Sequence, residues 1–275
     1  MFRLVLLLLV AVTTLIVYDS THTNHVMNDH PLIEKERYSQ LKTIQSSFFP
    51  KDIRIVTLGD SLTSGYGDQS GNGGYVPVLK SMLSDQRSIE NVDVKNYGIG
   101  GIYSTQLIDV LNKSYVQESI KNADYVIITI GGNDVIKAAQ EHFLQLTTEA
   151  FEEENKEFTR KVNIMIHKIK FYNPNAKIFF VGIYNPFASL FSSYVPEIDQ
   201  IIATWNEGTE QELSKYGNTY FIPLFDIFRG KEKEFLYDDF IHPNERGYKN
   251  IAFRVLTYLD HYDESTTYVV GEYEE

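Results

Sequence analysis

Three side chains in this sequence have the types and spacing of a nucleophile, a general base and a group that orients the base. Ser61 comes directly after an apolar run of strand type, on a glycine-rich turn from which a small side chain can project. His242 is a candidate base, and Asp239 lies three residues earlier, so that one turn can hold both side chains. A carboxylate there would fix the tautomer of the imidazole, so the three residues together fit nucleophilic catalysis.

Donors for a developing oxyanion are also present. Asn133 offers a side-chain NH2, Gly101 offers a backbone N–H that no side chain blocks, and Ser61 offers its own N–H. Three such donors could make an oxyanion hole, in which the loss of one donor typically lowers the rate by ~10²–10³. Gly98 or Gly100 could supply the glycine N–H in place of Gly101.

The elements that must position these residues alternate between strand and helix. Helical spacing of apolar residues predicts a helix over about 146–172 and a final helix from near Pro243 to about Leu259. Five short runs are rich in β-branched or aromatic residues and predict strands at 53–58, 92–94, 125–130, 178–181 and 220–222. The alternation predicts an α/β fold with three layers, αβα, around a mainly parallel five-stranded sheet.

Ligand sites in such sheets form at the carboxyl ends of the strands, and the candidate residues all lie there. Ser61, Gly101 and Asn133 follow the first three predicted strands, and Asp239 and His242 come just before the last helix. Each residue taken singly also fits a structural role, such as a turn serine, a packing glycine or a helix cap. Their occurrence in order at one edge of one sheet is what favours a catalytic site.

The sequence lacks the motifs of two other α/β enzyme classes. No Gly-x-Ser-x-Gly elbow surrounds Ser61, so an α/β-hydrolase is not supported. No phosphate loop of the Gly-x-x-x-x-Gly-Lys-Ser/Thr type occurs, and 98–101 does not match the dinucleotide fingerprint. His142 and His167 fall inside helical patterns and His261 ends the last helix, so none of these three competes with the predicted base.

Four blocks of the chain resemble those of the SGNH hydrolase superfamily, the GDSL-type esterases and lipases. In order, they are Gly59-Asp60-Ser61-Leu62, the glycine Gly101 within 96–101, Gly131-Gly132-Asn133-Asp134, and Asp239-Phe240-Ile241-His242-Pro243. The blocks span about 59–243 of the chain. The resemblance implies a flavodoxin-like αβα fold, no cofactor, and ester hydrolysis through an acyl-enzyme. In general appearance the chain resembles membrane-anchored, lipase/acylhydrolase-like members of Gram-positive bacteria.

We therefore expect a serine esterase or acylhydrolase that cleaves a lipid ester or a small acyl ester. Alternatives are a deacetylase or O-acyltransferase acting on cell-surface glycans, and a catalytically silent surface-binding module. Tyr66, Tyr103, Val135 and Tyr184 could line the substrate site. The aromatic segment 183–196 fits a lid or acyl-binding wall as well as it fits a helix and loop packed into the core.

The ends of the chain differ from its middle. Residues 1–18 hold one basic residue, Arg3, before a leucine-rich run that is short for a membrane span and suits a signal-peptide core. We expect an uncleaved signal anchor, or alternatively a cleaved signal peptide. A polar stalk over 19–50, a hydrolase domain over 51–262 and an acidic tail over 263–275 would follow. Either route would export the catalytic domain, held at the cell membrane or secreted.

Composition excludes further classes. The 25 Lys and Arg against 37 Asp and Glu give a net charge of −12, so a nucleic-acid partner is not expected. The absence of cysteine excludes a disulfide scaffold, a thiolate zinc site and a lipid-modified cysteine anchor. His22, His25 and His30 lie in the predicted stalk, where we expect a solvated linker and no metal site.

Overall fold

The structure is a computed structural model that describes residues 44–45, 50–142, 145–188, 195–262 and 267–268. Residues 49–263 form one compact unit, and the two ends of the chain form another. In the unit of the chain ends, strand β1 (Ile44–Gln45) pairs antiparallel with β7 (Thr267–Tyr268). This pairing joins the predicted stalk to the predicted tail, and it was not predicted from the sequence. Residues 1–18 lie outside the described residues.

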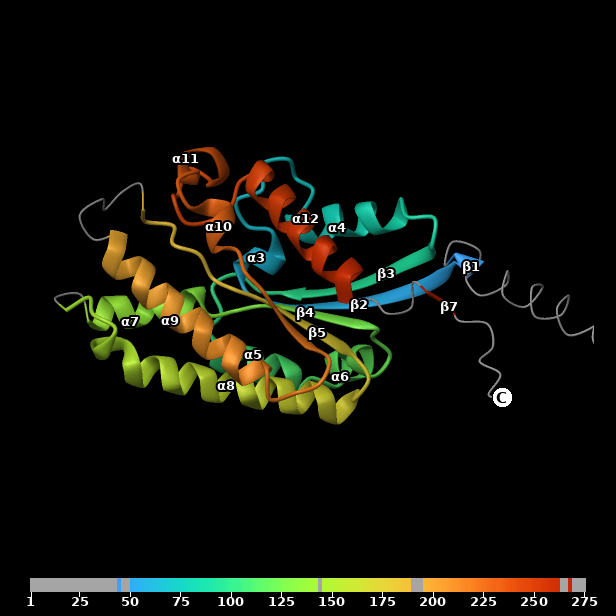
Figure 1. Ribbon diagram of the computed structural model, residues 1–275, viewed down its shortest axis with the longest axis horizontal. Coiled ribbons are helices and arrows are strands. Elements are labelled where there is room, and N and C mark those ends of the chain that lie inside the picture. Colours follow the sequence, from blue (N-terminus) through green and yellow to red (C-terminus); the bar gives the residue numbers. More distant parts are fainter. Residues whose placement is uncertain (1–43, 46–49, 143–144, 189–194, 263–266, 269–275) are drawn as a thin grey trace, which may run out of the picture. The chain divides into compact units, whose positions relative to one another are not determined.

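The larger unit is built on a sheet of five parallel strands in the order β3-β2-β4-β5-β6 (Figure 1). The strands are β2 (Lys51–Gly59), β3 (Ile89–Gly98), β4 (Tyr125–Thr129), β5 (Lys177–Val181) and β6 (Thr219–Ile222). The predicted five-stranded parallel sheet is therefore confirmed. β3 is longer than the predicted run 92–94 because it is an edge strand, whose polar residues face solvent without interrupting the ladder.

Helices cover both faces of the sheet, which confirms the three-layer αβα architecture. Apolar side chains alternate along each strand, so that Val126 and Ile128 pack on one layer while Tyr125 and Ile127 pack on the other. The first layer contains α5 (Ser104–Leu111), α6 (Ser114–Lys121), α7 (Gly132–Glu141), α8 (Glu152–Tyr172) and α9 (Val195–Leu213). The second contains α4 (Tyr75–Ser84), α10 (Phe225–Phe228), α11 (Glu232–Phe235) and α12 (Glu245–Tyr262).

Two of these helices were predicted from the sequence, and their observed bounds differ from the predicted ones. The helix expected over about 146–172 is a single 3-10 turn, Glu149–Phe151, followed by α8. The final helix was expected to start near Pro243, and α12 starts two residues later, at Glu245. α9 was not predicted, because the aromatic segment before it carries no clear signal for the start of a helix.

The strand order creates a topological switch point between β2 and β4. The chain runs from β2 outward to β3 and then crosses back to β4 on the other side of β2. Gly59 and Thr129, the last residues of β2 and β4, are register partners. The segments that carry Ser61 and Asn133 therefore leave the sheet side by side, at the place where open α/β sheets bind their ligands.

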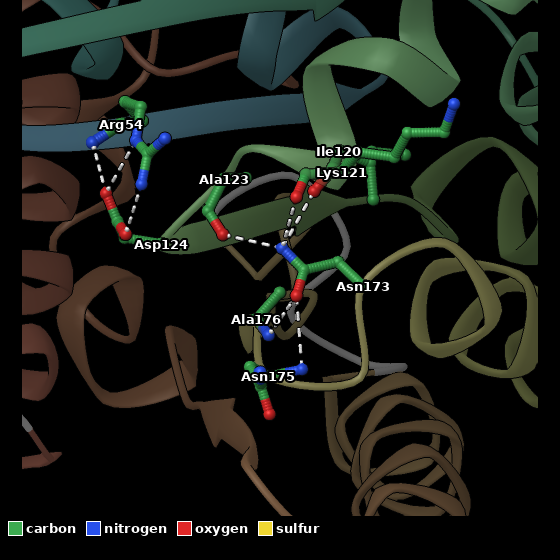
Figure 2. Close-up of polar contacts among 8 residues, drawn as sticks. All are labelled: Arg54, Ile120, Lys121, Ala123, Asp124, Asn173, Asn175 and Ala176. Atoms are coloured by element: carbon green, nitrogen blue, oxygen red, sulfur yellow. Dashed lines mark hydrogen bonds and ion pairs between the residues drawn. The ribbon is translucent and has the colours of Figure 1, made fainter.

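At the amino ends of β4 and β5, Asn173, which follows α8, binds the segments that lead into both strands (Figure 2). Its side-chain amide donates to the carbonyl oxygens of Ile120, Lys121 and Ala123 and accepts from the N–H groups of Asn175 and Ala176. Beside it, Arg54 of β2 forms an ion pair with Asp124 at 3.2 Å. One asparagine thus fastens the chain entering β4 to the chain entering β5.

Candidate active site

Ser61 lies at the carboxyl end of β2, at the first position of the short helix α3 (Ser61–Ser64). Asp60 caps this helix, since its Oδ1 accepts the N–H of Leu62 at 3.1 Å. The glycine before it is required by close approach: a Cβ on Gly59, where φ is +148°, would lie 2.1 Å from the carbonyl oxygen of Thr129. The turn that carries Ser61 is therefore fixed against β4.

Ser61, His242 and Asp239 form one hydrogen-bonded chain. His242 Nε2 lies 2.8 Å from Ser61 Oγ, and His242 Nδ1 lies 2.6 Å from Asp239 Oδ2. Asp239 Oδ1 accepts the N–H groups of Ile241 at 2.9 Å and His242 at 3.0 Å, so the carboxylate also closes the turn it belongs to. This arrangement places a proton on Nδ1 and leaves Nε2 to accept one from Ser61.

The environment of Asp239 keeps its carboxylate ionised. Partial burial alone would raise the pKa of Asp239, but the N–H groups of His242 and Ile241 and the imidazole of His242 outweigh burial. The pKa of Asp239 therefore lies below its usual range. An ionised carboxylate at neutral pH can stabilise the imidazolium that forms when His242 takes up a proton.

A buried tyrosine on the final helix also holds the Ser61 turn in place. The hydroxyl of Tyr248, on α12, donates to the carbonyl oxygen of Tyr66 at 2.6 Å and lies 3.4 Å from that of Ser61. Burial raises the pKa of Tyr248, so this hydroxyl stays protonated and remains a donor. The final helix thereby fixes the turn as well as carrying the chain away from His242.

Tyr184 has a different place from the one we expected. It was predicted to line the substrate site, but it is 8% exposed and stacks on Phe228, with ring centroids 3.9 Å apart. Its hydroxyl donates to the carbonyl oxygen of Ile241 at 2.7 Å. Tyr184 thus holds the residue before His242. An aromatic residue after a strand gives no sequence signal that separates these two roles.

The backbone donors of the predicted oxyanion hole are free. Among the described residues, no acceptor takes the N–H of Ser61 or that of Gly101. Gly101 is exposed and has a φ of +78°, a conformation that a glycine adopts without strain. The N–H of Gly98 is bound to Asn96 Oδ1 at 2.9 Å, so Gly98 is not the donor.

Asn133, at the start of α7, is tied to the Gly101 segment. Its side-chain amide donates one N–H to the carbonyl oxygen of Ile102 at 2.8 Å. The amide has a second N–H, and the bond to Ile102 fixes its direction. The next residue, Asp134, accepts the N–H of Ser104 at 3.0 Å and its hydroxyl at 2.5 Å. The start of α7 therefore holds the Gly101 segment at two successive positions.

Asp60 is a buried acid directly before Ser61 in the chain. Its Oδ1 accepts the hydroxyl of Thr129 at 3.0 Å, and a buried chain of hydroxyl groups continues from there to Thr63 and Tyr75. Burial raises the pKa of Asp60 to about 7, against the lowering effect of the bonds from Leu62 and Thr129. The sequence block that contains Asp60 was recognised, but the burial of its carboxyl group was not foreseen.

Several exposed apolar side chains lie in the segments that carry the site. Tyr66 is 56% exposed, and the edge of its ring contacts His242 with centroids 4.6 Å apart. Tyr103, which precedes α5, is 39% exposed and lies two residues after Gly101. Val135, by contrast, is half-buried and packs against the core. Sequence reasoning missed two more exposed residues within the catalytic blocks, Ile99 and Phe240.

The aromatic segment 183–196 is partly packed into the protein. Tyr184, Asn185 and Pro186 are buried, and Asn185 Nδ2 donates to Asp199 Oδ1 on α9 at 2.7 Å. Residues 189–194 lie outside the described residues, so the prediction of a lid has no counterpart in the part of the segment that is described.

Two other predictions concern residues that the structure does not describe. Within the described ranges, no cluster of three or more His, Asp or Glu side chains could hold a metal ion. The stalk histidines 22, 25 and 30 are not in those ranges. The described helices include none that is long and apolar enough to cross a bilayer, and the expected anchor, 1–18, is outside them as well.

Comparison with known proteins matches residues 57–249 to the GDSL-like lipase/acylhydrolase family. The uncharacterized protein YpmR of Bacillus subtilis is 40% identical over 205 residues, which are 74% of this chain and 80% of YpmR. The spore germination lipase LipC of Bacillus licheniformis is 26% identical over 207 residues, 73% of this chain and 93% of LipC. The crystal structure of the lipase Lip_vut3 from a goat rumen metagenome superposes with a TM-score of 0.67 at 25% identity, covering 74% of this chain and 96% of that one.

The matched region contains the Ser61 turn, the Gly101 segment, the start of α7 and the turn from Asp239 to His242. The family match and the arrangement of these segments both indicate ester hydrolysis. This chain belongs to the GDSL-like lipase/acylhydrolase family and is a carboxylic ester hydrolase.

Proposed function

We propose that the protein cleaves esters through an acyl-enzyme, with Ser61 as the nucleophile, His242 as the general acid and base, and Asp239 as the group that orients His242. The observation that carries this proposal is the continuous chain of hydrogen bonds, 2.8 Å from Ser61 Oγ to Nε2 and 2.6 Å from Nδ1 to Asp239. It lies at the topological switch point of the sheet, where the fold places its ligands.

In the first half of the reaction, Ser61 Oγ attacks the ester carbonyl carbon while His242 Nε2 takes the hydroxyl proton. The tetrahedral intermediate carries its negative charge on the former carbonyl oxygen, which the free N–H groups of Ser61 and Gly101 and the amide of Asn133 would stabilise. When the intermediate collapses, the bond to the alcohol oxygen breaks and His242 gives its proton to that oxygen.

In the second half, a water molecule attacks the acyl-enzyme and gives its proton to His242. The second tetrahedral intermediate uses the same donors, and its collapse returns the proton to Ser61 and releases the carboxylic acid. Asp239 keeps its negative charge throughout, because its low pKa leaves no proton on it at neutral pH. Its function is to hold the ring and to stabilise the imidazolium.

The proposed substrate is a lipid ester or a small acyl ester with apolar parts. Four of the exposed large apolar residues, Tyr66, Ile99, Tyr103 and Phe240, lie in the segments that carry the site. Apolar side chains left in water around a nucleophile favour an apolar ligand. Two of the similar proteins, LipC and Lip_vut3, are described as lipases, which supports the same substrate class.

Single substitutions with matched controls test the proposed residues on an aryl ester of a short-chain acid. Ser61→Ala and His242→Ala should each lower kcat by on the order of 10⁶, and Asp239→Asn by on the order of 10⁴. Ser81→Ala and His261→Ala change exposed residues of the same types and should keep wild-type kcat. A Ser61→Ala enzyme with wild-type turnover would show that the nucleophile is elsewhere.

A second experiment separates hydrolysis from the other activities. A fluorophosphonate probe should label wild-type Ser61 and not Ser61→Ala, whereas a silent binding module would not react. A screen over acyl chain length should favour apolar acyl esters over acetylated glycans. With an added alcohol acceptor, free acid should remain the main product, since ester product in excess would indicate a transferase.

We further propose that residues 1–18 anchor the enzyme in the cell membrane, with the catalytic domain outside. The leucine-rich run and Arg3 support this placement. The full chain should sediment with membranes and resist alkaline extraction, and a chain that lacks 1–18 should not. Release of a shortened chain into the medium would favour signal cleavage.

A further inference from the structure

Phe240 has a backbone conformation that its side chain disfavours. Its φ is +60°, and among the described residues the only other non-glycine residue with positive φ is Asn218. Asparagine tolerates this region because its short polar side chain can bond locally, whereas a bulky aromatic residue rarely adopts it. Phe240 is therefore a strained position next to Asp239.

The surrounding turn holds this strain in place. The N–H of Phe240 donates to the carbonyl oxygen of Tyr237 at 2.9 Å, and the N–H of Tyr237 donates to that of His242 at 2.7 Å. On the other side, Tyr184 binds the carbonyl oxygen of Ile241. These bonds are made by the backbone of the turn, so they would form equally well with glycine at position 240.

Burial does not compensate for the strain, because the Phe240 side chain is 48% exposed. A glycine would adopt the same φ without strain and would expose no apolar ring. Neither the fold nor the turn therefore accounts for an aromatic residue at this position. Backbone strain of this kind, at a catalytic turn, points to a role in ligand contact.

The location of Phe240 indicates which part of an ester it faces. In sequence it lies between Asp239 and His242, and the ring of Tyr66 contacts the imidazole of His242. Because His242 Nε2 must reach the oxygen of the leaving alcohol to protonate it, exposed side chains of the turn that carries His242 are placed to meet the alcohol side of the ester. The proposed oxyanion donors Gly101 and Asn133 come from other segments.

We propose that Phe240 is a specificity-determining residue that contacts the alcohol part of the substrate and selects esters whose alcohol is large and apolar. This inference rests on the proposed function, since it uses His242 as the acid that protonates the leaving group. It extends that function by naming the side of the ester that the exposed residue Phe240 recognises.

The test compares ethyl acetate with octyl acetate, which share the acyl group and differ only in the alcohol. Phe240→Gly removes the ring and also the strain, so the variant should unfold at the same urea concentration as wild type or higher. The ratio of kcat/KM for octyl acetate to that for ethyl acetate should fall by about tenfold or more. Phe240→Tyr, which keeps an aromatic ring, should retain most of the wild-type ratio.

The matched control is Phe253→Ala, which removes an aromatic ring that is 63% exposed on α12 and should leave the ratio unchanged. Equal losses on both esters in Phe240→Gly, or no loss on either, would overturn the inference while leaving the esterase function intact. A wild-type enzyme that hydrolyses neither ester, nor any other in the acyl series, would overturn the proposed function and this inference with it.

Discussion

The hydroxyl of Tyr184 lies 2.7 Å from the carbonyl oxygen of Ile241, the residue immediately before His242. A buried side chain that follows β5 therefore fixes a turn that is 57 residues further along the chain. Stacking against Phe228 holds the Tyr184 ring, so the hydroxyl has little freedom to move. The orientation of His242 thus depends on a residue that has no direct contact with it.

Tyr184→Phe should lower kcat by about fivefold, because a buried orienting hydrogen bond of about 1 kcal/mol is lost. KM for long-chain esters should stay near its wild-type value. Steady-state kinetics separate the two roles considered for Tyr184, since a residue of the substrate wall would raise KM and leave kcat unchanged. Tyr115→Phe, at an exposed tyrosine on α6, is the matched control.

Asn133→Ala should lower kcat by ~10²–10³ with little change in KM, because the amide would bind the oxyanion only after the attack on the carbonyl. Part of the effect would come from release of the Ile102 carbonyl oxygen, which is now bound to the amide. Asn155→Ala, an asparagine on α8 that bonds to Thr204, serves as the control. Equal kcat values for the two variants would show that Asn133 does not donate to the oxyanion.

Asp60 makes stability depend on pH in a direction opposite to that of most carboxyl groups. Folding raises the pKa of Asp60 from the ordinary value of 3.8 to about 7. A raised pKa means that the folded state holds the proton more tightly than the unfolded state. The stability contributed by this group is therefore complete below pH 3.8 and is lost as the pH rises through about 7.

Asp60→Asn removes this titration. Relative to wild type, its free energy of unfolding should improve between pH 4 and pH 8 by at most about 4 kcal/mol, since one pKa unit equals about 1.4 kcal/mol. Urea denaturation at several pH values measures the difference, with the exposed Asp85→Asn as control. If the difference in free energy of unfolding between wild type and Asp60→Asn did not change with pH, the raised pKa of Asp60 would be contradicted.

Asn173→Ala should destabilise the protein by about 3 kcal/mol, because carbonyl and N–H groups of the chain entering β4 and β5 lose their partners. The folded variant should keep wild-type kcat, since these bonds lie at the amino ends of β4 and β5, whereas Ser61 follows the carboxyl end of β2. Urea denaturation tests the first expectation and kinetics the second. Asn175→Ala, whose residue takes part through its backbone N–H, should change neither.

The sequence predicted the three central strands of the sheet, β2, β4 and β5, well because they are short runs of β-branched and aromatic residues that are buried on both faces. The sequence also predicted that Ser61, Asp239 and His242 lie at the same end of the sheet, because the carboxyl ends of parallel strands lie together. The role of Tyr184 could not be predicted. An aromatic residue after a strand fits a substrate wall and a buried anchor equally, and only tertiary contacts decide between them.

Two further features depend on information that residue types do not carry. The positive φ of Phe240 follows from how the turn is tied to Tyr237 and Tyr184, and the sequence block shows only that a phenylalanine is present. The pairing of β1 with β7 joins two-residue strands from opposite ends of the chain. Segments that short have no periodicity from which a strand could be recognised.

The hydrogen bond between Ser61 and His242 joins positions 181 residues apart. During synthesis, Ser61, the proposed nucleophile, emerges early, and His242, the proposed base, emerges only after β6 has been made. Until the turn from Asp239 to His242 docks, Ser61 is an ordinary serine hydroxyl with no group to take its proton. The growing chain is thus inactive toward esters, and its esterase activity arises only when folding is nearly complete.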